Sequence, residues 1–208
     1  MTTPLRTRRE EQRARTRQEL LDAAQVVFAR QGYHATSVDD VAEAAGYTKG
    51  AVYSNFRSKE ELFLELLDLR IDRNVEALED VLLSSEAAER PRMLGEIRDS
   101  IVIVDREWFL LQTEFMLYAA RNEEVRERVA DRQRRTRERI TELVRTTLAD
   151  MGITEPRVPV EDLAQLLLSA ASGLNHAGMI DDGVAAASGD LLTSLAEMLL
   201  VAISPAES

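Results

Sequence analysis

Apolar side chains recur every three or four residues along most of the chain, which is the spacing of amphipathic helices. The first helix is expected to begin near Thr16 and to end at Gly32. Its apolar stripe consists of Leu20, Leu21, Ala24, Val27 and Phe28. Further helices are expected at about 38–45, 48–56, 58–83, 94–104, 108–118, 123–150, 163–177 and 192–202. The pattern predicts an all-α protein of about nine helices.

Residues 1–15 lack this periodicity and are expected to form a basic N-terminal arm. Arginines at positions 6, 8, 9, 13 and 15 face only Glu10 and Glu11 as opposing charges. Basic arms often follow phosphates or enter a minor groove of DNA. A disordered, solvated tail explains the same residues, and both interpretations stay open.

Two short helices joined by a glycine-containing turn are expected between residues 37 and 56. Ser37 and Thr48 suit the first turn of each helix, because their hydroxyls can accept from free backbone N–H groups. Gly46 suits the positive φ that ends the first helix. Val52 and Phe56 face inward, one turn apart. The outer positions of the second helix are Lys49, Gly50, Tyr53, Ser54 and Arg57. The arrangement is typical of a helix-turn-helix, whose second helix reads the major groove; an ordinary polar surface helix is the alternative.

A long helix is expected from Ser58 to about Leu83. Ser58 with Glu61 forms the pattern of a capping box. Lys59 lies in the first turn, where the helix dipole disfavours a cation unless a phosphate binds there. A solvated lysine without a role is the alternative. The helix leaves the short ones and enters the rest of the chain, so it can couple the two mechanically.

The run from Thr36 to Leu62 resembles the DNA-binding head of the tetracycline-repressor (TetR) family, with a match over roughly residues 16 to 65. The resemblance implies an all-α fold with an N-terminal helix-turn-helix head and a C-terminal helical domain for effector binding and dimerisation. It implies a bacterial homodimeric repressor that a small molecule releases from a palindromic operator in double-stranded DNA. The residues it places at the DNA are Ser37, Thr48, Lys49, Gly50, Ala51, Tyr53, Ser54, Asn55 and Lys59.

Charge divides the chain in a way that suits this reading. Residues 1–60 contain ten basic and eight acidic residues, a net charge of +2, and residues 61–208 contain sixteen basic and twenty-nine acidic, a net of −13. A basic head attracts phosphates and an acidic body repels them. We therefore expect a DNA-binding domain at 1–60 and an effector-binding and dimerisation domain at 61–208.

The composition also limits the classes of function. The 208 residues contain no cysteine, which fits a reducing cytoplasm, and 45% hydrophobic residues support a proper core. No run of 18 apolar residues and no signal peptide is evident, so we expect a cytoplasmic protein without a membrane span. No Ser/His/Asp set, phosphate loop or HExxH pattern is present, and one histidine, His176, follows residue 61. We expect no enzyme, cofactor or metal site.

The aromatic stretch at 108–118 is the expected wall of an effector pocket, by the family resemblance. The proposed lining is Trp108, Phe109, Gln112, Phe115, Met116, Tyr118, Asn175 and His176. A neutral hydrophobic ligand is expected unless Glu114 faces the pocket unpaired, which would favour a cation. Two alternatives stay open: the aromatic residues are ordinary core, and Glu114 pairs with a neighbouring arginine.

The last two helices are apolar on more than one side, which predicts a partner. The expected dimer interface is Leu163, Leu167, Ala170, Leu174, Leu192, Leu195 and Leu199. Complete burial within one subunit is the alternative. A second function also stays open, a DNA-binding regulator whose body serves only dimerisation or protein contacts and takes no small ligand.

Overall fold

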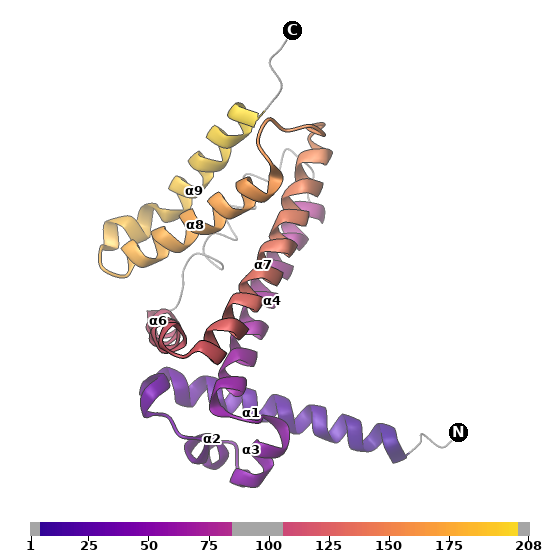
Figure 1. Cartoon of the computed structure of the whole chain (residues 1–208), viewed down its shortest axis with the longest axis vertical. Coiled ribbons are helices and arrows are strands. Elements are labelled where there is room, and N and C mark those ends of the chain that lie inside the picture. Colours follow the sequence, from indigo (N-terminus) through magenta and orange to yellow (C-terminus); the bar gives the residue numbers. More distant parts are fainter. Residues whose placement is uncertain (1–4, 85–105, 204–208) are drawn as a thin grey trace. The chain divides into compact units, whose positions relative to one another are not determined.

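A computed structural model describes residues 5–84 and 106–203, and in that part of the chain it contains eight helices and no strand (Figure 1). The helices are α1 Leu5–Ala35, α2 Val38–Ala44, α3 Lys49–Asn55, α4 Lys59–Ser84, α6 Arg106–Arg121, α7 Glu123–Asp150, α8 Val160–Gly178 and α9 Asp182–Ile203. The prediction of an all-α fold is confirmed. The helix expected at 94–104 lies outside the described residues.

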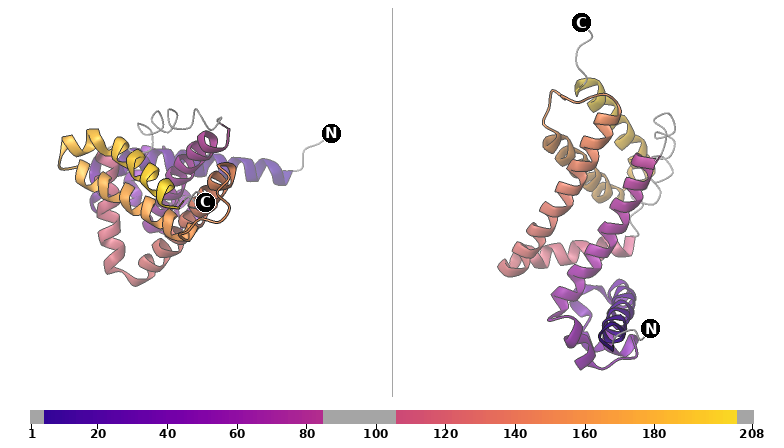
Figure 2. Two further views of the ribbon diagram at one scale, coloured as in Figure 1. Left: turned by 90° about the horizontal axis from the view of Figure 1, so that it is seen from above. Right: turned by 90° about the vertical axis from the view of Figure 1, so that its right-hand side faces the viewer.

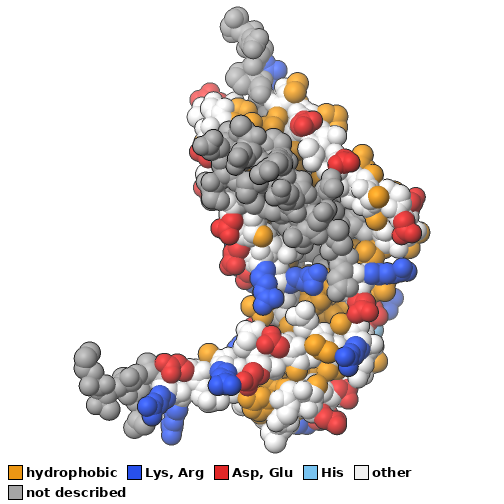
Figure 3. All heavy atoms as spheres, turned by 180° about the vertical axis from the view of Figure 1, so that it is seen from behind, with side chains coloured by type: hydrophobic (Ala, Val, Ile, Leu, Met, Phe, Trp, Pro, Cys, Tyr) orange, Lys and Arg blue, Asp and Glu red, His pale blue; other side chains and the backbone are white. Residues whose placement is uncertain are grey.

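The expected start of the first helix at Thr16 is wrong, because α1 already begins at Leu5. Its first half has no buried stripe, and residues 8–15 are exposed. Arginine side chains there lie beside acidic ones, as Figure 3 shows along the extended end of α1. Arg, Glu, Gln and Ala are good helix formers without any core to pack on, and the pair Arg15–Glu19, 2.9 Å apart, adds an i,i+4 contact. Gly32 interrupts the helix as expected, with φ 80° and ψ 167°.

The described chain divides into two compact units. Unit 1 contains residues 5–70 and 106–129, and unit 2 contains residues 71–84 and 130–203. The helix-turn-helix, the start of α4 and all of α6 therefore share unit 1. Within it, α1 packs against α2, α3 and α6, and α2 packs against α3 (Figure 2).

An aromatic cluster forms the centre of unit 1. Phe28 and Tyr33 of α1, Phe63 of α4 and Phe115 of α6 are each at most 1% exposed. The ring of Phe63 lies 5.1 Å from Phe28, 5.2 Å from Tyr33 and 4.5 Å from Phe115, measured between centroids. Trp108 stacks on Phe63 at 6.1 Å. Buried aromatic pairs at such distances add to the apolar area they remove from water, so this cluster fixes α6 to α1 and α4.

Unit 2 is aliphatic at its centre. Val75 of α4, Ile140 of α7 and Ala164 of α8 form one buried cluster, and Leu148 with Leu163 forms a second. The helices α8 and α9 lie close together at Gly178, where an added Cβ would be 3.1 Å from the Cα of Ala185.

Candidate nucleic-acid interface

The first short helix, α2, is bounded by local side-chain and backbone chemistry. The Ser37 hydroxyl accepts from the N–H of Asp40 at 3.2 Å, and the Asp40 carboxylate accepts from the N–H of Ser37 at 2.7 Å. This hydroxyl and backbone hydrogen bonding holds the pKa of Asp40 below its ordinary value. At the other end Gly46 has φ 70°, and the Tyr47 N–H donates to the carbonyl of Ala42 at 2.8 Å. The caps set the angle at which the chain enters the next helix.

The second short helix, α3, presents one face to its own unit and one to solvent. Thr48 caps it by accepting from the N–H of Ala51 at 3.2 Å. Val52 and Phe56 are each 1% exposed and anchor the inner face, whereas Tyr53 is 48% exposed. The predicted caps and the predicted inward and outward sides of α3 are confirmed.

The outer face of α3 is open at Gly50. A Cβ added there would meet only the Thr48 hydroxyl oxygen, at 3.8 Å, among the described atoms within 4 Å. Glycine in a helix costs stability relative to alanine. Because the space around Gly50 is open, packing within unit 1 does not explain why glycine occupies this position. A bare helix surface lets the backbone of another molecule approach closely.

Lys49, at the start of α3, carries its charge on the same surface. Its Nζ donates to Asp39 Oδ2 of α2 at 2.7 Å, and both side chains are more than half exposed. The hydrogen bond and the charge of Asp39 raise the pKa of Lys49. Such an exposed ion pair is weak and exchanges partners readily, so the ammonium can leave Asp39 for an incoming anion.

Two polar residues at the end of α3 are bound to their own helix. The Ser54 hydroxyl donates to the carbonyl of Ala51 at 2.8 Å, and Asn55 Nδ2 donates to the same oxygen at 2.9 Å. The Ser54 side chain is exposed, and its hydroxyl oxygen also accepts from Asn55 Nδ2 at 3.3 Å, whereas Asn55 is half-buried.

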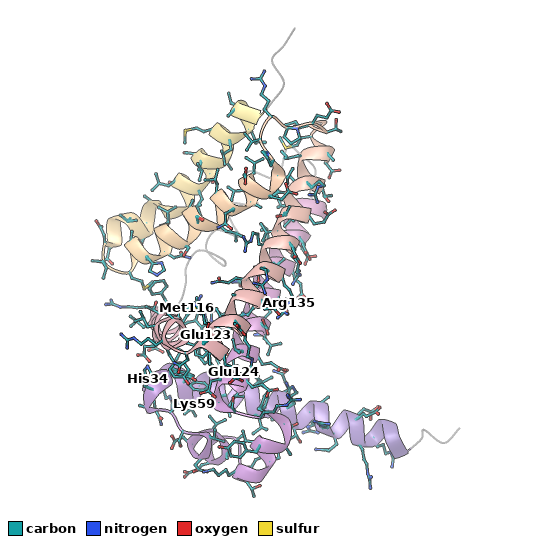
Figure 4. The ribbon with its side chains drawn as sticks, in the orientation of Figure 1. His34, Lys59, Met116, Glu123, Glu124 and Arg135 are labelled. Atoms are coloured by element: carbon teal, nitrogen blue, oxygen red, sulfur yellow. The ribbon has the colours of Figure 1, made fainter. Side chains whose placement is uncertain are left out.

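Lys59 is held inside unit 1. Its Nζ donates to the carbonyls of Tyr33 at 2.9 Å and Thr36 at 3.0 Å and lies 4.4 Å from the centroid of the Tyr33 ring. In Figure 4 it lies beside His34, at the end of α1. Burial lowers the pKa of Lys59. The ammonium thus ties α4 to the end of α1, and its contact with a phosphate stays a prediction.

The start of α4 shows half of the expected capping box. The Ser58 hydroxyl accepts from the N–H of Glu61 at 3.2 Å. The Glu61 carboxylate, however, accepts from the N–H of Arg57 at 2.8 Å, one residue before the expected donor.

Family models match both parts of the chain. Residues 20–66 match the model described as bacterial regulatory proteins, tetR family, and residues 102–200 match the BetI-type transcriptional repressor, C-terminal. The chain belongs to the TetR family. It is therefore a DNA-binding transcriptional regulator and not an enzyme, as the sequence predicted.

Individual relatives agree with this TetR-family assignment. The chain is 29% identical over 164 residues to the uncharacterised HTH-type transcriptional regulator YfiR of Bacillus subtilis, over 75% of this chain and 76% of YfiR. It is 29% identical over 162 residues to the repressor AcnR of Corynebacterium efficiens, over 76% of this chain and 79% of AcnR. Two solved structures share the fold at 21% identity. A putative TetR-family regulator from Rhodococcus sp. has a TM-score of 0.71 and covers 89% of this chain and 98% of its own. FadR of Bacillus subtilis, solved with stearoyl-CoA, has a TM-score of 0.66, and the match covers 90% of this chain and 99% of the FadR chain.

The expected effector residues of this TetR-family chain lie in both units. Trp108, Phe109 and Phe115 are buried in unit 1, and Tyr118 Oη donates to Glu60 Oε1 at 2.9 Å. Gln112 and Met116 on the same helix are half-buried. Asn175 and His176 lie on α8 in unit 2, where His176 Nδ1 is 2.8 Å from the carbonyl oxygen of Ser172. The aromatic cluster of unit 1 accounts for Phe115 without a ligand, and the effector site stays a prediction.

Glu114 has a contact that neither expectation included. Its Oε2 accepts from the backbone N–H of Tyr33 at 2.8 Å. A Cβ on Gly32 would lie 2.9 Å from the same oxygen. No sequence signal links these residues, because 81 positions separate Glu114 from Tyr33.

The expected dimer residues differ in their burial. Leu163 is 2% exposed against Leu148, and Leu199 packs on the same cluster. Leu167, Ala170, Leu174, Leu192 and Leu195 are half-buried. The apolar side chains that unit 2 leaves exposed on α8 and α9 are Leu166, Leu191, Met198 and Val201. The dimer interface stays a prediction.

Length and hydropathy alone would let Asp182–Ala202 of α9 cross a membrane, with a mean hydropathy of 1.5 and 11% of its most apolar window buried. A helix that pairs with a second protein has the same composition, so this is weak evidence for a span. Among the described residues, no group of three or more His, Cys, Asp or Glu side chains is placed to hold a metal ion.

Proposed function

We propose that the protein is a cytoplasmic homodimeric repressor whose α3 reads a palindromic operator and which a small-molecule effector releases. The observation that carries the proposal is the outer face of α3. It combines an exchangeable lysine, an exposed tyrosine and hydroxyl, and a glycine whose surroundings are open. The inner face is anchored, so docking on DNA would not disturb the core of unit 1.

The contacts follow from where each side chain lies. Lys49, Gly50 and Ser54 would lie near base edges, and Tyr53 would position a phosphate with its exposed hydroxyl. Ser37 and Thr48 cap helices whose first N–H groups favour anions. The remaining expected contacts are Ala51, Asn55 and Lys59. Lys59 is the weakest of them as a phosphate ligand, because two backbone carbonyls already hold its ammonium.

Dimerisation would use the exposed apolar stripe of unit 2. Leu166 is 52% exposed, Met198 62% and Val201 81%, and they lie on the adjoining helices α8 and α9. Two such helix pairs from two subunits form a four-helix bundle related by a two-fold axis. The two heads would then meet half-sites about 34–36 Å apart, or a multiple of that.

Effector release is supported by the contacts of α6. Glu114 and Tyr118 bond to α1 and α4, and the aromatic cluster packs α6 into unit 1. A ligand that displaced α6 would therefore disturb the helix-turn-helix directly. The fold neighbour FadR was solved with stearoyl-CoA, which agrees with the hydrophobic effector expected here. A thousandfold loss of operator affinity needs about 4 kcal/mol of coupling.

A pair of substitutions at one position tests the reading of DNA by α3. The probe is a duplex that the wild-type protein enriches from a random-sequence library. Gly50→Ala adds one methyl group in open space, so the fold should be as stable as wild type or more so. Gly50→Leu should fold equally well and bind the enriched duplex at least tenfold more weakly. Wild-type affinity in a folded Gly50→Leu variant would remove α3 from the interface.

A ligand screen separates the two kinds of regulator. Thermal-shift measurements with hydrophobic and cationic compounds should find at least one that stabilises the protein and weakens binding to the enriched duplex. A regulator whose body serves only dimerisation or protein contacts would show no such compound.

A further inference from the structure

One arginine joins three elements of unit 1 at the end of α3. Arg17 of α1 donates through Nε to Glu65 Oε1 of α4 at 2.7 Å, and a terminal nitrogen pairs with the other carboxylate oxygen. The second terminal nitrogen donates to the carbonyl of Asn55, the last residue of α3. The guanidinium also lies over the ring of Phe56, 4.2 Å from its centroid.

The contacts with Asn55 and Phe56 restrain α3, and the pair with Glu65 anchors the guanidinium that makes them. The last carbonyls of a helix have no partner within it, and a cation there is favourable. The side chains of Arg17 and Glu65 are only 30% and 32% exposed, so solvent competes less for this pair than for a surface pair. The buried Phe56 ring fixes the plane of the guanidinium. Arg17 thus holds the end of α3 at a set distance and angle from α1 and α4.

We propose that Arg17 is a positioning residue for DNA recognition: it orients α3 without itself contacting the operator. The proposal rests on the proposed role of α3 in reading DNA. It requires a guanidinium, because one planar fork must serve a carboxylate in two bonds, a carbonyl in a third and an aromatic face. A lysine offers a point charge and no such plane.

Arg13 is the matched comparison within the same helix. It lies one turn earlier and donates to the carbonyl of Ser54 at 3.4 Å, with an exposed side chain. The structure shows it with neither a carboxylate partner nor an aromatic ring below it in the described residues. Both arginines place the same charge at the C-terminal end of α3. The contrast between their variants therefore separates a positioning role from simple electrostatics.

The test measures affinity for the library-enriched duplex and for a scrambled duplex of equal length, over a range of salt concentrations. The variants are Arg17→Lys, Arg17→Gln, Glu65→Gln and Arg13→Gln, each checked for helical content and thermal midpoint. Arg17→Lys and Arg17→Gln should bind the enriched duplex about tenfold more weakly, as loss of charge-assisted bonds implies. The ratio of enriched to scrambled affinity should fall, and the salt slope should stay unchanged. Arg17→Gln and Glu65→Gln should be non-additive in affinity, and Arg13→Gln should keep the ratio.

Each of the following results would overturn the proposal. Equal weakening on both duplexes with a salt slope lower by about one would make Arg17 a phosphate contact. A lower thermal midpoint with wild-type affinity and selectivity of the folded protein would make it a stabilising residue only. Gly50→Leu is measured beside the set: if that variant binds as wild type, the reading of DNA by α3 fails as well. If Gly50→Leu loses binding and the Arg17 variants keep it, the positioning proposal alone fails.

Discussion

Replacing Gly32 by alanine should destabilise unit 1 far more than the same change at another glycine with positive φ. With φ 80° and ψ 167°, Gly32 occupies a backbone region that is essentially reserved for glycine, and an alanine there costs about 1–3 kcal/mol. The new Cβ would also lie 2.9 Å from Glu114 Oε2. The carboxylate must move away and loses its bond to the Tyr33 N–H, a charge-assisted bond of about 1.5–3 kcal/mol. We expect a total loss of about 2.5–6 kcal/mol.

Gly46→Ala is the control for this prediction. Gly46 has φ 70°, and a Cβ there meets no described atom within 4 Å, so only the backbone cost of about 1–2 kcal/mol applies. The assay is urea unfolding followed by the fluorescence of Trp108, the single tryptophan of the chain, which is buried in unit 1. In a Glu114→Ala background the further cost of Gly32→Ala should fall to its backbone cost of about 1–3 kcal/mol. Equal losses for the two glycine variants in the wild-type background would refute the contact between Gly32 and Glu114.

The remaining predictions concern pH, Lys59 and assembly. Burial opposes ionisation of Glu60, but hydrogen bonds and the charge of Lys59 leave its pKa below the ordinary value. The unfolded state therefore binds more protons than the folded state in acid. The free energy of unfolding should fall as the pH drops below about 4.3. Glu60→Gln should flatten this decline in urea titrations at pH 5 and pH 3.5, and an unchanged decline would contradict it. Lys59→Ala should lower the free energy of unfolding by about 1 kcal/mol, because two carbonyls lose their donor. A salt slope of DNA binding that falls by about one, with unchanged stability, would instead make Lys59 a phosphate ligand. Glutamate at both Leu166 and Met198 should give monomers in sedimentation, whereas a dimer that survives would place the interface elsewhere.

The helix caps and the inward side of each short helix were predictable from the sequence, because the residues that form them are only a few positions apart. The caps at Ser37 and Thr48, the positive φ of Gly46 and the inward side of α3 at Val52 and Phe56 all follow from spacing within one or two turns. The start of α1 was missed for a related reason. Periodicity shows only helices that bury a stripe, and the residues before Leu20 make a helix by propensity alone.

Contacts between distant segments were not predictable. Arg17 meets Glu65 across 48 positions and Glu114 meets Tyr33 across 81, and no local pattern marks either pair. The side of α8 and α9 that faces a partner stays a prediction. Along α8 the spacing of apolar residues does not tell Leu163, which is buried, from Leu166, which is exposed.

DNA cleavage from a tethered reagent tests the docking of α3 most directly. The chain has no cysteine, so Arg57→Cys, exposed just beyond α3, and Glu197→Cys, exposed on α9, each give one attachment site for an iron–EDTA group. On the library-enriched duplex, the label at position 57 should cut at two symmetric clusters, with centres about 34–36 Å apart or a multiple of that. The label at position 197 should cut at background level. Absence of localised cuts from position 57, or equal cutting from position 197, would contradict recognition of the operator by α3.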